Sequence, residues 1–140
     1  MDRRNFIKKS GALCLIGVAG TAAFLESCKK NNTTPAPQGP TVNFTLDTSL
    51  PANSSLNTSG GSVSSNGVVV ANSGGTFIAV AQSCTHNGCS VGYNPSGNNF
   101  VCPCHGGVFD ASGNVTSGPP PGPLKKYTVT KSGTILTIVG

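Results

Sequence analysis

Two short runs, Cys84–Cys89 (CTHNGC) and Cys102–Gly106 (CPCHG), decide how this 140-residue sequence folds. Together they hold both histidines and four of the six cysteines of the chain. The spacing is C-x-H, then fifteen residues, then C-x-x-H, and each run offers two sulfurs and one imidazole. Such donors on two neighbouring loops are typical of a bound metal. The sequence therefore predicts a metal centre built from the cysteines and histidines of these two runs.

Around these runs, the sequence reads as short strands separated by turns. Glycine (19) and proline (10) are plentiful, and only 9% of residues are charged. Val42, Phe44 and Leu46 alternate with polar residues, which is the period of a half-buried strand. No segment after residue 28 keeps a helical period over eleven residues. Further strands are predicted at 67–71, 76–82, 90–93, 99–101, 108–109, 124–130 and 134–139.

These strands predict an all-β domain at residues 41–140, built as a small antiparallel β-sandwich or partly open barrel. The two Cys–His runs would form a metal-binding subdomain of two loops. A domain of about 100 residues folds with little margin, so a metal or a covalent cross-link would help it. Neither an internal repeat nor a second domain is evident.

The net charge of +5 lies mainly outside the predicted domain. Six of the nine basic residues precede residue 31, whereas residues 41–140 hold three lysines and two aspartates, a net charge of +1. No basic stripe with interleaved aromatic residues is present. We therefore expect no nucleic-acid partner.

Residues 1–27 have the pattern of a signal peptide. Residues 1–9 are polar and basic, and Gly11–Leu25 is a 15-residue apolar stretch. As a helix, this stretch would rise about 22 Å, less than the roughly 30 Å hydrocarbon core, so a permanent membrane span is the less favoured interpretation. The run Asp2–Lys8 resembles a twin-arginine export signal apart from Asp2, and an ordinary secretory leader is the alternative.

Residues 28–40 predict a lipid anchor followed by a flexible linker. Leu25–Cys28 resembles a lipobox, in which cleavage before Cys28 exposes that cysteine for lipidation. Glu26 is unusual in such a motif, so a free or removed Cys28 is the alternative. Residues 29–40 lack apolar periodicity and could extend by roughly 40 Å at most. The expected location is the periplasmic, extracytoplasmic face of a membrane.

The two Cys–His runs resemble the Rieske family, in which one iron of a [2Fe–2S] cluster takes two thiolates and the other takes two imidazoles. The resemblance spans about Gly67–Gly140. It includes the proline-rich run Gly118–Leu124, which looks like the loop that packs beside the cluster in this family. It implies that one iron binds two cysteines and the other two histidines, namely Cys84 with Cys102 and His86 with His105.

The same resemblance implies a disulfide between Cys89 and Cys104. Respiratory members of the family have this pair, and ferredoxins that serve ring-hydroxylating oxygenases lack it. A disulfide also needs an oxidising compartment, which agrees with the export signal. Gly88 and Gly106 would either let the loop amides reach the cluster sulfurs or serve as plain turn glycines.

Three residues depart from the respiratory pattern. Gly107 and Phe109 stand where respiratory members carry Ser and Tyr, whose hydroxyls hydrogen-bond to a cluster sulfide and a ligand sulfur. This implies a potential below that of respiratory relatives and above that of all-cysteine clusters. Asn87 stands where those members usually carry a Leu that meets the quinol pocket, so quinol docking is less secure.

The function implied is that of an exported one-electron carrier or electron-transfer subunit, which exchanges electrons with redox proteins and breaks no substrate bond itself. The alternatives are the iron–sulfur subunit of a quinol-oxidising complex and that of an arsenite-oxidase-like enzyme. Two further alternatives remain. Gly107 and Phe109 resemble the ferredoxins that serve oxygenases, and two cysteines with two histidines could also form a structural zinc site. The sequence identifies neither the electron donor nor the acceptor, and it predicts no small-molecule substrate.

Overall fold

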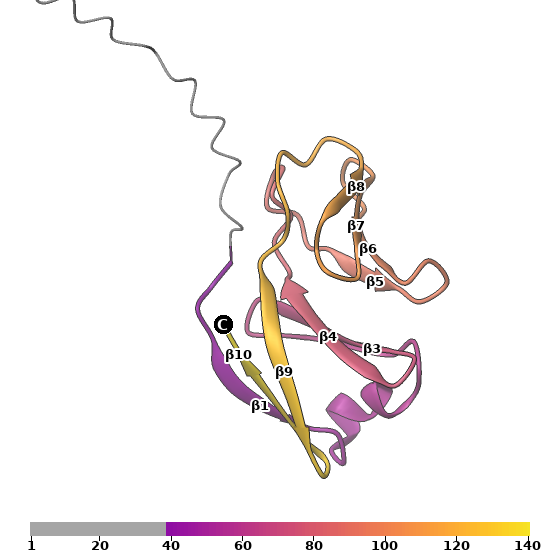
Figure 1. The fold of residues 1–140 in the computed structure, drawn as a ribbon, viewed down its shortest axis with the longest axis vertical. Helices are drawn as coiled ribbons and strands as arrows, with labels where there is room; N and C mark the ends of the chain where they lie inside the picture. Colours follow the sequence, from indigo (N-terminus) through magenta and orange to yellow (C-terminus); the bar gives the residue numbers. More distant parts are fainter. Residues whose placement is uncertain (1–38) are drawn as a thin grey trace, which may run out of the picture. The chain divides into compact units, whose positions relative to one another are not determined.

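The fold is a pair of antiparallel β-sheets in residues 39–140, the part of the chain that the computed structural model describes (Figure 1). The larger sheet has the strand order β1-β10-β9-β4-β3-β2. Its strands are β1 (Asn43–Asp47), β2 (Ser62–Ser65), β3 (Val68–Ser73), β4 (Thr76–Ala81), β9 (Lys126–Ser132) and β10 (Ile135–Val139). The smaller sheet has the order β5-β6-β7-β8. Its strands are β5 (Gly92–Asn94), β6 (Asn99–Cys102), β7 (Gly107–Asp110) and β8 (Val115–Ser117).

The predicted all-β class is confirmed, with two strands and one short helix added to the prediction. β2 (SVSS) and β8 (VTS) contain one apolar residue each, so neither has a recognisable alternation. They are strands because they pair with the apolar strands β3 and β7. η1 (Pro51–Asn57) is a 3-10 helix of seven residues, too short to produce a helical period.

The ends of the predicted strands shift by up to two residues, and two of these shifts lie next to the Cys–His loops and the proline-rich run. The strand predicted at 90–93 corresponds to β5 but begins later, at Gly92, because Ser90 makes only an isolated bridge with Ser83. The strand predicted at 124–130 begins at Lys126, because Leu124 lies before the strand and is buried in a core with residues of both sheets. Neither change moves a Cys–His run out of its loop.

The hairpin of β3 and β4 is buried on both faces, which explains its continuous apolar sequence. Val68, Val70 and Ala79 face a first core within the larger sheet. Val69 and Val80 point the other way, into a second core. The residues of this second core come from both sheets and from the loops between them: Val69, Val80, Cys84, Val91, Phe100, Cys102, Phe109 and Leu124.

The leader predictions lie outside the described residues. This applies to the signal peptide at residues 1–27, to lipidation at Cys28 and to nearly all of the linker at 28–40. Within residues 39–140, no helix is both long and apolar enough to cross a bilayer.

Candidate metal centre

The two Cys–His runs form two loops on closed stems. The first loop, Cys84–Cys89, lies between β4 and β5, and the bridge between Ser83 and Ser90 closes its base. The second loop, Cys102–Gly106, joins β6 to β7, and Cys102 pairs there with Gly107. Each loop therefore projects from a hydrogen-bonded stem.

The loops share one turn geometry. The amide of Gly88 donates to the carbonyl of Cys84 at 2.8 Å, and the amide of Gly106 donates to that of Cys102 at 3.1 Å. Both glycines have left-handed backbone conformations, with φ of 73° and 71°, which a side chain would disfavour. They are therefore turn glycines, and their amides bond to carbonyl oxygens instead of reaching toward sulfur. Each turn leaves a cysteine at the base of its loop and a histidine nearer the tip.

The sulfurs of Cys84 and Cys102 lie at the buried base of the loops. Their residues are 3% and 2% exposed, and both pack into the second core. Burial raises the pKa of the Cys84 thiol, and the neighbouring Cys102 thiol raises it further, against hydrogen bonds from backbone amides. Two adjacent buried thiolates are costly without a compensating positive charge. A metal at this base would supply that charge.

The histidines occupy the exposed tips. The Nδ1 atoms of His86 and His105 lie 3.2 Å apart, and the two rings meet edge to face with centroids 4.7 Å apart. The two imidazole nitrogens therefore lie close enough together to serve as two ligands of one metal atom. The donors form one buried pair of sulfurs and one exposed pair of nitrogens. This arrangement fits the two-iron group that the sequence implies, with a like pair for each iron.

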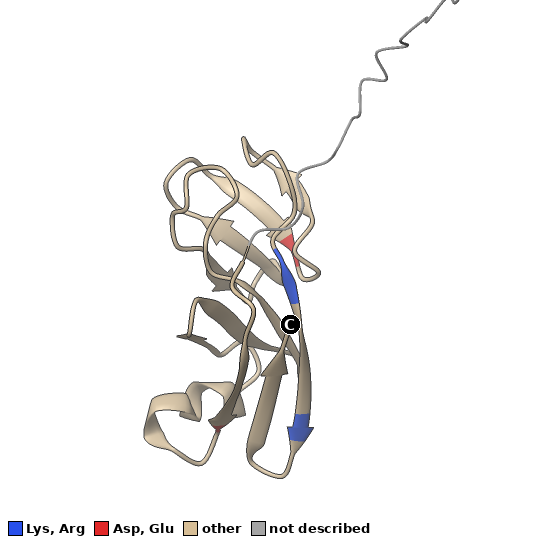
Figure 2. Ribbon diagram, turned by 90° about the vertical axis from the view of Figure 1, so that its left-hand side faces the viewer, with Lys and Arg blue, Asp and Glu red and all other residues tan. Residues whose placement is uncertain are grey.

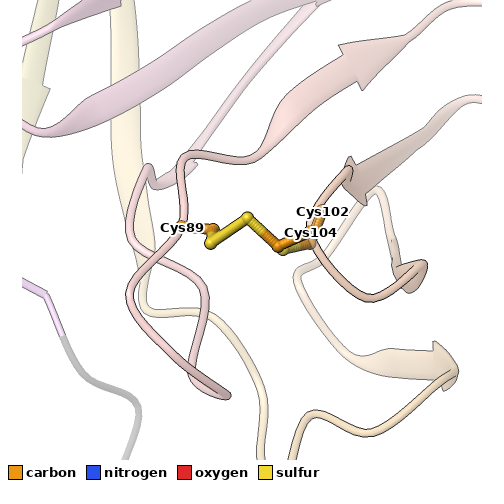
Figure 3. Close-up of side chains that lie close together, drawn as sticks. All are labelled: Cys89, Cys102 and Cys104. Carbon is orange, nitrogen blue, oxygen red and sulfur yellow. A yellow bond between two sulfur atoms is a disulfide. The ribbon is translucent and has the colours of Figure 1, made fainter.

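The predicted disulfide is present, and it ties the two loops together (Figure 3). Cys89 and Cys104 are joined with an S–S distance of 2.07 Å and a Cα–Cα distance of 6.4 Å. Cys84 and Cys102 are free. The sulfur of Cys102 nevertheless lies close to the disulfide, because the sulfurs of Cys89, Cys102 and Cys104 are all within 4.8 Å of one another.

The proline-rich loop, Gly118–Leu124, covers the base of the second loop. Pro120 is buried against Gly107, and a Cβ atom added to Gly107 would lie 2.6 Å from Cγ of Pro120 and 3.6 Å from Cβ of Cys102. The hydroxyl of Thr85 donates to the carbonyl of Gly122 at 2.7 Å, which fastens the first loop to the proline-rich loop. The predicted packing of this loop beside the centre is thereby confirmed.

Sequence reasoning missed two of these contributors. Thr85 is an ordinary loop residue whose only signal is its place inside the C-x-H run. Pro120 belongs to a run that was expected nearby, but nothing in the sequence pairs it with Gly107.

Comparison with known proteins decides the family. Residues 47–128 match the family model of the Rieske [2Fe-2S] domain. The chain belongs to the Rieske [2Fe-2S] domain family. A [2Fe–2S] cluster is therefore its cofactor.

Two relatives of this Rieske chain are proteins of different kinds, an iron-sulfur subunit and a carotenoid synthase. Over 71 residues it is 42% identical to the cytochrome b6-f complex iron-sulfur subunit of Chlorobaculum thiosulfatiphilum, covering 51% of this chain and 39% of that protein. Over 71 residues it is also 44% identical to the carotenoid phi-ring synthase of Chlorobaculum tepidum, covering 51% of this chain and 11% of that protein. The chain thus spans well under half of each relative.

A solved structure shares the fold of the Rieske chain. The ferredoxin of carbazole 1,9a-dioxygenase from Nocardioides aromaticivorans aligns with a TM-score of 0.52 over 61% of this chain and 91% of that one. Their sequences are 24% identical, so the likeness concerns the fold alone.

Removing the Thr85 hydroxyl should loosen the proline-rich loop. We expect Thr85→Val, which keeps the shape of the side chain, to lower the free energy of unfolding by about 1 to 2 kcal/mol, because the buried carbonyl of Gly122 loses its donor. Denaturant unfolding followed by circular dichroism measures the change.

Thr116→Val is the matched control. Its hydroxyl also donates to a backbone carbonyl, that of Val108, but Thr116 is exposed at the edge of the smaller sheet, so we expect a loss below about 0.5 kcal/mol. Equal losses in the two variants would contradict the role given to Thr85.

Proposed function

We propose that this chain is an exported one-electron carrier or electron-transfer subunit, with Cys84 and Cys102 bound to one iron and His86 and His105 to the other. The observation that carries the proposal is the sorting of the donors into a buried sulfur pair and an exposed nitrogen pair. When bound, the cluster takes up and releases one electron at a time.

The residues around the site divide the work of such a carrier. The second core excludes water from the sulfurs of Cys84 and Cys102. His86 and His105 reach the surface, so their ring edges are where a partner would contact the site. Because their Nδ1 atoms face one another, each Nε2 atom is free to hold a proton or to donate to a partner.

The surface around the histidines favours recognition by close fit over long-range charge steering. The two Cys–His loops and the proline-rich loop contain no charged side chain. Residues 39–140 hold five charged side chains, with Asp47 on β1, Asp110 on β7, Lys126 and Lys131 on β9, and Lys125 just before β9. Figure 2 shows how sparse the charged positions of this part of the chain are. An uncharged docking surface gives little electrostatic acceleration of binding.

A second candidate is the iron–sulfur subunit of a quinol-oxidising complex. The similarity to a cytochrome b6-f iron-sulfur subunit and the Cys89–Cys104 disulfide both favour it. Asn87 is exposed beside His86, where an apolar residue would suit a quinol pocket better. The similarity to part of a carotenoid synthase supports a third candidate function, a redox domain that supplies electrons to an enzyme. The arsenite-oxidase-like subunit is an example of the same kind of function.

Location follows the sequence-based predictions. We propose that residues 1–27 direct export, that Cys28 carries a lipid, and that residues 29–40 tether the domain to the outer face of a membrane. Mass spectrometry of the protein released from membranes would detect a lipidated Cys28 at its amino terminus. An unmodified Cys28 would argue against the anchor.

Metal analysis and spectroscopy of the full chain test the proposed site. We expect about two irons and two sulfides per chain, and an EPR signal on reduction. His86→Ala and His105→Ala should each lose that signal, whereas Thr116→Ala should keep it. One zinc per chain without sulfide would overturn the proposal. Isolation of the protein from membranes with a large redox partner would favour the subunit over the free carrier.

Phe109 offers a test of how the potential is set. The ring is fully buried in the same core as Cys84 and Cys102. We expect Phe109→Tyr to bring a hydroxyl within reach of a ligand sulfur and to raise the reduction potential by about 40 to 90 mV. Phe77→Tyr, on the first core, is the control and should leave the potential unchanged. Voltammetry measures both, and an unchanged potential in Phe109→Tyr would contradict this tuning.

Gly107 cannot be tested by a single substitution, because Pro120 fills the space of its side chain. We expect Gly107→Ser alone to displace the proline-rich loop without raising the potential. Combined with Pro120→Ala, the serine gains room, and the potential should rise above that of Pro120→Ala alone. Voltammetry of the three variants checks this. A rise in Gly107→Ser alone, equal to that in the double variant, would show that the two positions are independent.

A further inference from the structure

Three sulfurs meet where the two loops touch, and each has a different environment (Figure 3). Cys102 is a free and buried thiol, Cys89 is half-buried, and Cys104 is exposed. The Cys89–Cys104 bond therefore has a free thiol within 4.8 Å of both its sulfurs. Such a neighbour is a potential attacking group for thiol–disulfide exchange.

We propose that the disulfide of this chain isomerises whenever Cys102 holds no metal, and that Cys104 becomes an exposed thiol. Sγ of Cys102 attacks Sγ of Cys89 as its thiol proton is removed. A Cys89–Cys102 bond forms as the Cys89–Cys104 bond breaks, and the electron pair leaves on the sulfur of Cys104. The proton given up by Cys102 is balanced by the proton that Cys104 takes up, so the exchange needs no oxidant or reductant.

Attack at Cys89 is favoured over attack at Cys104 for two reasons. A Cys102–Cys104 bond would close a small ring across Pro103, whose backbone is restricted, whereas a Cys89–Cys102 bond still joins the two loops. The leaving sulfur also matters, because Cys104 is exposed and its thiolate is hydrated as it departs. Cys89 packs against the second core and would be the poorer leaving group.

The exchange has two consequences for the chain. It creates an exposed thiol at Cys104, open to mixed-disulfide formation with a small-molecule disulfide. It also takes Cys102 out of use as a ligand, and here the inference rests on the proposed ligand set. A cluster on Cys102 would thus protect the disulfide, and a chain that exchanged first would need a thiol reductant before it could accept a cluster.

Disulfide mapping of the full chain tests the exchange. Protein made in iron-depleted and in iron-replete medium is purified without reductant, alkylated with N-ethylmaleimide under native conditions, and digested with pepsin in acid, which prevents further scrambling. Fragment-ion sequencing then locates the label on Cys102 or Cys104. We expect iron-depleted protein to carry the label on Cys104 and to yield a Cys89–Cys102 linkage, whereas iron-replete protein keeps the Cys89–Cys104 linkage.

Two variants identify the attacking sulfur. In Cys102→Ser, label on Cys104 should fall by about tenfold or more, because the nucleophile is missing. In Cys84→Ser, label on Cys104 should persist. Iron-depleted wild type that keeps the Cys89–Cys104 linkage would overturn the proposal, and so would a Cys102–Cys104 linkage. These outcomes depend on the thiols and not on cluster binding, so failure of the proposed electron-transfer function would leave the test intact.

Discussion

The second core is the packing on which the rest of the structure depends. Val69 and Val80 extend it from the larger sheet, and Phe100 and Phe109 extend it from the smaller one. The same core encloses the sulfurs at the base of both Cys–His loops. Packing of the two sheets and placement of the two thiols are therefore one event, because neither sheet can bury its inner face without closing around the cysteines.

Three links then hold the loops over that core, each of a different kind. The Cys89–Cys104 disulfide joins the two loops covalently, and for a loop of about fifteen residues such a bond contributes roughly 3 kcal/mol. Thr85 joins the first loop to the proline-rich loop by a hydrogen bond. Pro120 packs on the second loop at Gly107. Together they leave the histidines exposed while the sulfurs stay buried, which is what an electron-transfer site at a protein surface requires.

The sequence was most informative where chemistry restricts the choice of residue. The C-x-H and C-x-x-H runs supplied the four candidate ligands, and the resemblance paired Cys89 with Cys104, a pairing that the structure contains. Alternation or continuous apolar runs predicted eight of the ten strands, with β2 and β8 missed. These two are set by pairing with neighbours and not by their own residues. Thr85 escaped notice for a related reason, since its partner is the carbonyl of Gly122, 37 residues away, and any residue has a carbonyl.

Gly107 illustrates how a difference from relatives can be misread one position at a time. Taken alone, Gly107 means only that this chain lacks the serine hydroxyl of respiratory members. In the structure, the space beside Cys102 that a side chain at 107 would enter is filled by the ring of Pro120, so the two positions form one packing unit. A buried apolar ring beside Cys102 excludes water, and this would disfavour the added negative charge of a reduced cluster. On the proposed ligand set, the missing hydroxyl and the inserted ring would therefore act on the potential in the same direction, and both would lower it.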